Sequence, residues 1–217
     1  MQVTLKKVLA KLSSSPKTLP LKVKRSTSDK LAKYKSMRSA NKTPEPFTSK
    51  DLDKNKLYFV VQKHQATALH YDFRLEVSGV MSSWAVPRGP TLDPSVKRLA
   101  MKTEDHPLDY RHFQGIIPKG EYGGGKVEIW DEGTYLPEVE IAKGLRKEIK
   151  DKREGEEVML AGIKKGEIKF RLFGKKLKGS FALVKTKGFP PGKSKNAWLL
   201  IKHKDDKVKA GFDAANY

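Results

Sequence analysis

The chain contains no cysteine among its 217 residues, which excludes disulfide bridges, thiolate metal sites and a cysteine nucleophile. It also has no run of about 18 apolar residues, so we expect no membrane span. The N-terminus lacks the apolar core of a secretory signal, and we therefore expect a cytoplasmic protein. Hydrophobic residues make up only 37% of the chain and charged residues 32%. These proportions favour one sizeable domain with surface extensions.

Acidic residues are too few to balance the basic ones. The 45 Lys and Arg residues face 25 Asp and Glu residues, which leaves a formal net charge of +20. Such an excess attracts polyanions, most commonly nucleic acid; an anionic lipid surface or an adaptation to salt are the alternatives. Residues 1–45 carry half of the excess, with twelve basic and two acidic residues. We interpret residues 1–26 as a flexible basic arm that precedes a single domain at 27–217.

The remaining chain is predicted to be mainly β. A short helix is expected at Lys30–Arg38, and the polar stretch Glu138–Lys152 has helical spacing. The predicted strands are Leu57–Lys63, Tyr71–Val77, Val80–Pro87, Lys97–Lys102, Lys126–Tyr135, Glu167–Phe173, Lys178–Thr186 and Ala197–His203. Ser78-Gly79 predicts a tight hairpin, whereas Gly115–Gly125 and Gly188–Lys195 are expected to be loops. About eight strands with few helices favour a β-barrel with some short flanking helices.

One predicted strand has an unusual polar face. Because side chains alternate along a strand, His70, Asp72, Arg74 and Glu76 share one face of this strand. Tyr71, Phe73 and the following apolar residues form the other face. A polar row on a strand that is otherwise aromatic suggests a polar pocket inside the barrel. Glu76 lies roughly 13 Å along the strand from His70, so we expect it to orient Arg74 or a neighbouring group rather than bind a metal.

The preceding strand contributes Gln62 and His64, which also share a face. His64, His70 and Asp72 form an H-x5-H-x-D set. Two imidazoles and a carboxylate are a common ligand set for a divalent transition metal. Such an ion can polarise a phosphoryl oxygen or activate water. The alternative is that both histidines are ordinary strand or loop residues and that Asp72 pairs with Arg74 on the surface.

Further basic and proton-carrying side chains follow. Arginine suits phosphate because its donors form a planar fork, and Arg74, Arg88 and Arg98 are candidates for this role. His106 and Tyr110 in DHPLDYRHF are candidates for proton transfer or phosphoryl contact. Taken singly, each of these residues is as well explained by solvation or capping. The glycine-rich segment GEYGGG lacks the spacing of a P-loop.

Taken together, the segments FVVQKHQATALHYDFRLE, WAVPRGPTLDPSVKRLAMKTEDHPLDY, GIIPKGEYGGG and WLLIKHKD resemble the 3′-phosphoesterase family. Members of this family form the N-terminal domain of bacterial DNA ligase D or occur as stand-alone archaeal and bacterial proteins. The resemblance covers about residues 30–205, and the motifs come in the family's order. Since no ligase or polymerase segment follows, we expect the stand-alone form.

The resemblance implies a barrel fold and Mn²⁺ as cofactor, although the residues alone leave Co²⁺ and Zn²⁺ open. It implies removal of a 3′-terminal ribonucleoside and hydrolysis of the remaining 3′-phosphate to a 3′-hydroxyl. The metal ligands would be His64, His70 and Asp72. The implied residues for phosphate binding and catalysis are Gln62, Arg74, Arg88, Arg98, His106 and Tyr110.

A further family segment, R-D-F-x-x-T-P-E, matches Arg38 and Glu45 as substrate-binding residues. Ser39 and Ala40 replace the usual acid and aromatic residue. We therefore expect 3′-phosphate hydrolysis more firmly than ribonucleoside removal.

The leading hypothesis is a monomeric enzyme that acts on DNA or RNA-tipped DNA 3′ ends, beside a separate ligase and polymerase. With no covalent nucleophile evident, water is the expected attacker. The first alternative is a non-catalytic basic module that binds nucleic-acid ends and recruits those enzymes. The second is a metal phosphatase for small substrates.

Overall fold

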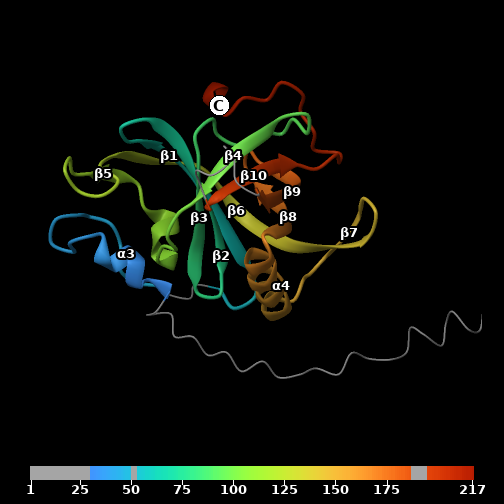
Figure 1. The fold of residues 1–217 in the computed structure, drawn as a ribbon, viewed down its shortest axis with the longest axis horizontal. Coiled ribbons are helices and arrows are strands. Elements are labelled where there is room, and N and C mark those ends of the chain that lie inside the picture. The colour runs from blue at the N-terminus through green and yellow to red at the C-terminus, as the bar shows by residue number, and fades with distance from the viewer. Residues whose placement is uncertain (1–29, 50–52, 187–194) are drawn as a thin grey trace, which may run out of the picture.

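The computed structural model describes residues 30–49, 53–186 and 195–217 as a mainly β, single-domain fold (Figure 1). In chain order, the strands are β1 (Leu57–Gln65), β2 (Leu69–Val77), β3 (Val80–Val86), β4 (Lys97–Lys102), β5 (Gly115–Ile117), β6 (Gly125–Ala142), β7 (Leu145–Glu148), β8 (Glu167–Gly174), β9 (Lys178–Lys185) and β10 (Ala197–Lys202). The helical elements are α3 (Ala32–Ser36), α4 (Lys152–Lys165) and the 3₁₀ helices η1 (Leu108–His112) and η2 (Ala214–Asn216).

Eight of these strands close into a barrel, as the sequence predicted. Their order is β1-β2-β3-β4-β10-β9-β8-β6, and β1 closes the circle by pairing with β6. This closing pair runs antiparallel from Leu57 opposite Tyr135 to Gln65 opposite Lys126. The two remaining strands, β5 and β7, pair with opposite ends of the long strand β6. The predicted eight-stranded barrel is therefore confirmed.

The β2–β3 hairpin also forms where the sequence predicted it. Val77 pairs with Val80 across the turn, and both turn residues have positive φ angles, 53° at Ser78 and 82° at Gly79. Two consecutive positive φ angles define the tight turn that matches the twist of paired strands. This hairpin sets the register of β2 against β3, which later brings Ser83 opposite Arg74.

The barrel interior is filled by one face of each strand. On β2, Tyr71, Phe73 and Leu75 are at most 2% exposed and belong to the main core cluster, together with Trp84 and Trp198. Since side chains alternate, the polar row of β2 lies on the outer wall of the barrel. The predicted polar pocket inside the barrel was therefore wrong. Aromatic and aliphatic side chains from the surrounding strands fill that space instead.

The predicted helical stretch Glu138–Lys152 was also wrong. Strand β6 continues to Ala142 and turns back into β7. The apolar residues whose spacing suggested a helix are largely exposed, with Leu145 at 56%. They therefore do not form a buried helix face. The buried Glu138 instead holds the two strands, since it accepts from Arg146 Nη1 (3.2 Å) and Ser180 Oγ (2.6 Å).

The real helix in this region, α4, begins after Asp151. The Asp151 side chain accepts a hydrogen bond from Glu154 N (2.8 Å), which caps the helix. Gly166 ends the helix in the left-handed conformation with φ 95°. In between, Met159 is fully buried in the core cluster. Helix α4 thus packs against one end of the barrel (Figure 1).

Several smaller predictions can be compared with the structure. The expected short helix appears as α3, and the glycine-rich loop contains the short strand β5. The proposed arm at 1–26 and nearly all of the predicted loop Gly188–Lys195 lie outside the described residues. Within the described ranges, we find no helix long and apolar enough to cross a bilayer.

Candidate metal and phosphate site

His64, His70 and Asp72 come together on the outer wall of the barrel. The antiparallel register places Gln62 opposite Asp72 and His64 opposite His70. One ligand atom from each residue of the triad lies within 4.8 Å of the others. His64 Nδ1 is 3.3 Å from Asp72 Oδ2, and His70 Nε2 is 3.6 Å from Asp72 Oδ1. The spacing predicted from sequence therefore produces a real cluster.

Backbone carbonyls orient both imidazoles of this triad. His64 Nε2 lies 2.8 Å from Gly123 O, and His70 Nδ1 lies 3.0 Å from Ala68 O. Because a carbonyl only accepts, each of these nitrogens carries the hydrogen. The lone pairs of His64 Nδ1 and His70 Nε2 then face the Asp72 carboxylate. This arrangement is common for metal-binding histidines, and the donor set fits a divalent transition metal.

Arg74 lies beside the triad and is only 2% exposed. Its guanidinium donates to Gln62 Oε1 (2.7 Å), Ser83 Oγ (2.8 Å) and Asp72 Oδ2 (2.9 Å). Its Cζ also lies 4.6 Å from the ring centroid of Tyr110. Gln62 in turn donates to the backbone oxygens of Tyr110 and Phe113. Gln62 therefore links the guanidinium to η1.

The Asp72 carboxylate is ionised in this environment. Burial alone would raise its pKa, but nearby positive charge, chiefly that of Arg74, outweighs that effect. The pKa of Asp72 is therefore lowered. An ionised carboxylate that faces two imidazole lone pairs creates a negatively polarised position, which favours a bound cation.

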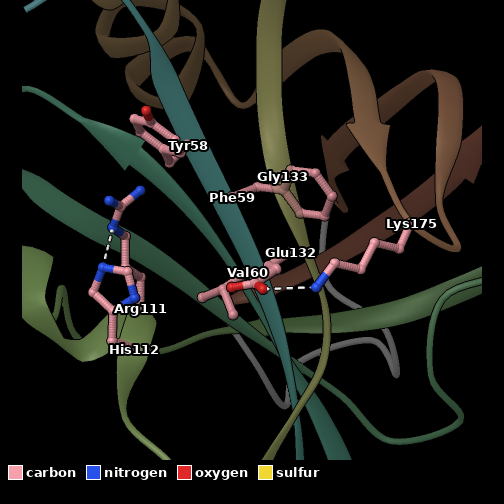
Figure 2. A pocket seen from close by; sticks show the side chains of 8 residues that line it. All are labelled: Tyr58, Phe59, Val60, Arg111, His112, Glu132, Gly133 and Lys175. Carbon is pink, nitrogen blue, oxygen red and sulfur yellow. Dashed lines mark hydrogen bonds and ion pairs between the residues drawn. The ribbon is translucent and has the colours of Figure 1, made fainter. Parts of the chain in front are cut away.

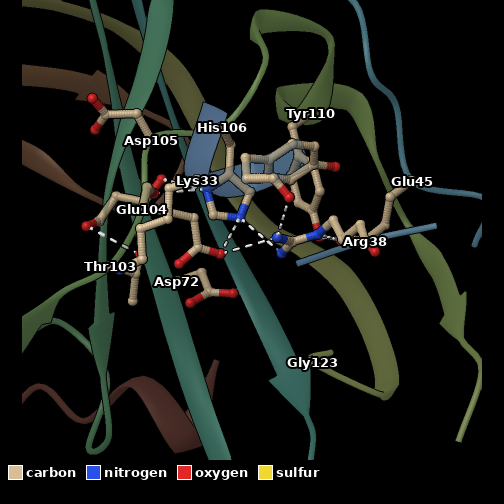
Figure 3. A network of polar contacts seen from close by, with 12 residues as sticks. Lys33, Arg38, Glu45, Asp72, Thr103, Glu104, Asp105, His106, Tyr110 and Gly123 are labelled. Atoms are coloured by element: carbon tan, nitrogen blue, oxygen red, sulfur yellow. Dashed lines mark hydrogen bonds and ion pairs between the residues drawn. The ribbon is translucent and has the colours of Figure 1, made fainter. Parts of the chain in front are cut away.

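A second set of polar contacts joins Arg38 to His106 (Figure 3). Arg38 donates to Glu45 Oε1 (2.9 Å) and Glu104 Oε1 (3.1 Å), and its Nη2 lies 3.4 Å from His106 Nε2. His106 Nδ1 donates to Glu104 O (3.0 Å). Backbone hydrogen bonds between His106 and Met81 of β3 fix the position of the ring. Arg38 therefore reaches the site from the segment that precedes the barrel.

His106 is neutral at pH 7 in this setting. Burial and the nearby charges of Arg74 and Arg38 lower its pKa well below the usual value. Tyr110 also stays protonated, since burial raises its pKa well above 10, and its hydroxyl donates to Glu45 Oε1 (2.9 Å). The cluster thus combines two buried guanidinium groups with neutral proton-carrying groups.

Sequence reasoning missed several residues of this cluster. Glu104 and Ser83 bridge its members, and the ring of Tyr34 lies 4.0 Å from Arg38 Cζ. Thr43 Oγ1 donates to Glu45 Oε2 (2.8 Å). Glu104 stands two residues before His106, so alternation could have placed the two side chains together. The approach of Tyr34 depends on tertiary contacts and left no local signal.

The structure does not bring every predicted residue into the cluster. Arg98 shares the inward face of β4 with the buried Ala100, and its Nη2 lies 3.9 Å from Asp213 Oδ2. Arg88 is exposed just after β3, at the end of the β2–β3 pair that contains His70. The expectation that Glu76 orients Arg74 was wrong, because its carboxylate accepts from Lys152 Nζ (2.7 Å).

Two cavities are found in the described part of the chain, one at the glycine-rich loop and one at η1. The first, of about 570 Å³, lies between β5, the β1–β2 turn and the glycine-rich loop that contains Gly123. The second, of about 300 Å³, lies on the far side of η1, where Arg111 Cζ stacks 3.9 Å from the ring centroid of Tyr58 (Figure 2). Lys175 at this second cavity is paired with Glu132 (2.9 Å). Of these two cavities, only the first is lined by Gly123, whose carbonyl oxygen contacts His64 of the triad.

Comparison with known proteins places this constellation in a family. Residues 62–185 match the family described as the DNA Ligase D 3'-phosphoesterase domain. The multifunctional non-homologous end joining protein LigD of Pseudomonas aeruginosa is 44% identical over 186 residues, which is 85% of this chain and 20% of that protein. The DNA repair protein LigD of Mycobacterium tuberculosis is 41% identical over 189 residues, or 87% of this chain and 22% of that protein. LigD of Mycolicibacterium smegmatis is 44% identical over 190 residues.

The chain belongs to the DNA ligase D 3′-phosphoesterase domain family. The family match spans more than half of the chain and contains His64, His70 and Asp72, together with Arg74 and His106. The chain spans about a fifth of the length of these relatives.

Proposed function

We propose that this protein is a metal-dependent phosphoesterase that processes DNA 3′ ends in non-homologous end joining. It would hydrolyse a 3′-phosphate to a 3′-hydroxyl and remove a 3′-terminal ribonucleoside. The observation that carries the proposal is the oriented triad of His64, His70 and Asp72 beside the buried Arg74. Family membership supports it independently.

In this proposal, His64 Nδ1, His70 Nε2 and the Asp72 carboxylate hold the metal ion. When bound, Mn²⁺ or a similar ion would polarise a phosphoryl oxygen and lower the pKa of water. The protein's own contribution is orientation: the Gly123 and Ala68 carbonyls fix the two rings, and Arg74 holds Asp72 in its ionised form.

Arg74 and Arg38 would stabilise negative charge that develops on the phosphoryl group. Three partners fix the guanidinium of Arg74 before substrate arrives, so little reorganisation is needed. His106 is neutral in the free protein, and an anionic phosphate nearby would raise its pKa. The ring could then protonate a leaving oxygen. We assign Tyr110 and Glu45 to hold Arg38 and the ring of His106 in place.

The exchange of Ser39 and Ala40 for the family's usual residues leaves this network intact. Both residues are exposed, while the contacts of Arg38 go to Glu45, Glu104 and His106. We therefore propose that both reactions are retained.

An end-labelled primer–template assay tests this proposal. The primer would end in a 3′-phosphate or in one 3′-ribonucleotide, and each would be incubated with Mn²⁺, Co²⁺, Zn²⁺ or EDTA. The wild type should process both ends only with metal. His70→Ala should lose more than about 100-fold in rate, as expected when an essential ligand is removed. His203→Ala, a histidine outside the cluster, is the matched control.

The alternatives predict different results. Tight, salt-sensitive binding of the primer without turnover in any metal would favour the non-catalytic end-binding module. Faster hydrolysis of small phosphate monoesters than of DNA ends would favour a general phosphatase. Calorimetric titration with Mn²⁺ measures the loss of metal binding in His70→Ala, and an unchanged thermal unfolding curve shows that this variant is still folded.

A further inference from the structure

The glycine-rich loop between β5 and β6 stands directly beside the metal triad. Gly123 O accepts the hydrogen of His64 Nε2 at 2.8 Å. Gly123 has a φ of 78°, which favours glycine, and a Cβ at Gly125 would collide with Gln65 O at the end of β1. The loop is therefore held against β1 in a conformation that other residues would strain. The motif GEYGGG thus has a local structural role unrelated to a P-loop.

The cleft behind this loop is large enough to hold a small molecule. Its volume of about 570 Å³ lies within the usual range for ligand pockets. Ile116 of β5 contributes an exposed apolar side chain, glycine backbone and Thr67 contribute polar groups, and Lys119, Lys126 and Glu121 add charged groups. The side chain of Ile116 is 69% exposed.

Tyr122 does not line the cleft itself, but it stands between two lining residues of the loop, Glu121 and Gly123, and extends toward the cluster. Its ring centroid lies 5.1 Å from Arg38 Cζ, and its side chain is 46% exposed. Burial raises its pKa, the negative charges of Glu104 and Asp72 raise it further, and the positive charge of Arg38 acts in the opposite direction. The Tyr122 ring therefore lies at the solvent-exposed edge of the cluster. The next residue in the loop, Gly123, contacts His64 through its carbonyl oxygen.

We propose that the cleft and the Tyr122 ring bind the leaving nucleoside when the substrate is a phosphodiester. This inference rests on the proposed function and names its second binding site. In that reaction, the oxygen of water bonds to phosphorus and the bond from phosphorus to the 5′-oxygen of the terminal ribonucleoside breaks. The leaving oxygen takes up a proton, which gives a free ribonucleoside and a primer 3′-phosphate.

A nucleoside fits these observations better than another ligand class. An aromatic ring can stack on any base, and the exposed Ile116 side chain can cover other apolar parts of the nucleoside. The cleft adjoins His64, so a group placed there lies next to a phosphate held at the triad. A 3′-phosphate end carries no group beyond the phosphate and leaves the cleft empty. Substitutions in the cleft should therefore affect removal of the ribonucleoside but not hydrolysis of the 3′-phosphate.

Steady-state kinetics on the two substrates test this selectivity. Stacking contributes about 1–3 kcal/mol per base, which corresponds to roughly 5- to 150-fold in binding. Tyr122→Ala should raise KM for the ribonucleotide-ended primer at least about ten-fold and change KM for the 3′-phosphate primer less than about two-fold. Tyr122→Phe keeps the ring and should behave as wild type. Ile116→Ala should raise KM on the ribonucleotide end only, whereas Ile141→Ala, at a similarly exposed isoleucine remote from the loop, should change neither.

A binding measurement separates this inference from the proposed function. Fluorescence anisotropy in EDTA, where turnover is not expected, should show that Tyr122→Ala weakens binding of the ribonucleotide-ended primer but not of the 3′-phosphate primer. If the wild type processes neither end, the proposed function fails while this comparison still decides the nucleoside site. Equal effects of Tyr122→Ala on both primers, or no effect on either, would overturn the inference.

Discussion

At Arg38, a side chain that is 4% exposed lies between two carboxylates that are no more exposed. Removing the guanidinium would leave Glu45 and Glu104 buried and without their shared cation. Breaking one side of a buried ion pair typically costs 3–5 kcal/mol. We expect Arg38→Met to lower the free energy of unfolding by about that amount in urea titration. Adding Glu104→Gln should restore part of the loss, and strictly additive effects would contradict the shared role of the cation.

His106 gives stability a specific dependence on pH. Its pKa is lowered in the folded state, so the unfolded chain binds a proton first as pH falls below about 6.5. The contribution of the neutral ring is therefore complete above that value and declines toward the lower folded pKa, by up to about 1.4 kcal/mol per pH unit.

Urea titration of wild type and His106→Gln between pH 7.5 and 5 measures this contribution. The stability difference between the two proteins should shrink as pH falls, while the other histidines affect both alike. A constant difference would show that His106 does not titrate in this range.

Single residues also show how far the sequence could predict the site. Alternation along β1 and β2 was sufficient to bring Gln62, His64 and Asp72 together, because strand geometry fixes those neighbours. Arg98 was predicted on its residue type and on the resemblance, neither of which reveals which face of β4 it occupies. Glu76 was misassigned for a similar reason, since its partner Lys152 belongs to a helix that the sequence pattern did not predict.

At the scale of secondary structure, α4 offers a test of local against tertiary stabilisation. The Asp151 side chain caps the helix by accepting from Glu154 N. Asp151→Ala should lower the free energy of unfolding by about 1 kcal/mol without changing catalytic rates, because α4 lies away from the site. Glu157→Ala, an exposed change on the same helix, is the control and should cost less than about half as much in thermal unfolding.

The elements also explain why the region of α4 was predicted poorly. Helical spacing in Glu138–Lys152 competed with pairing to β7, and pairing prevailed because Glu138 is buried between Arg146 and Ser180. A pattern of apolar residues cannot reveal such a polar contact. By contrast, β1 to β4 and β8 to β10 carried clear alternation or apolar runs, and they were predicted close to their observed bounds.

For the whole molecule, charge dominates the expected behaviour toward nucleic acid. Residues 1–26 contain seven of the 45 Lys and Arg residues and no acidic residue. Deleting this segment should make the plot of log affinity against log salt shallower, by about 0.9 for each duplex phosphate that the segment neutralises. Anisotropy titrations between 50 and 300 mM NaCl measure the slope. Parallel plots would mean that the segment does not bind phosphate.

The order of strands around the barrel has a consequence for synthesis of the protein. Every side chain of the cluster precedes residue 124, yet β10 (197–202) must insert between β4 and β9 before the wall closes. Until then, a nascent chain on the ribosome carries all side chains of the cluster on a sheet with two open edges, which are prone to pair with other chains. Activity should therefore emerge only after the last strand is released, late in translation.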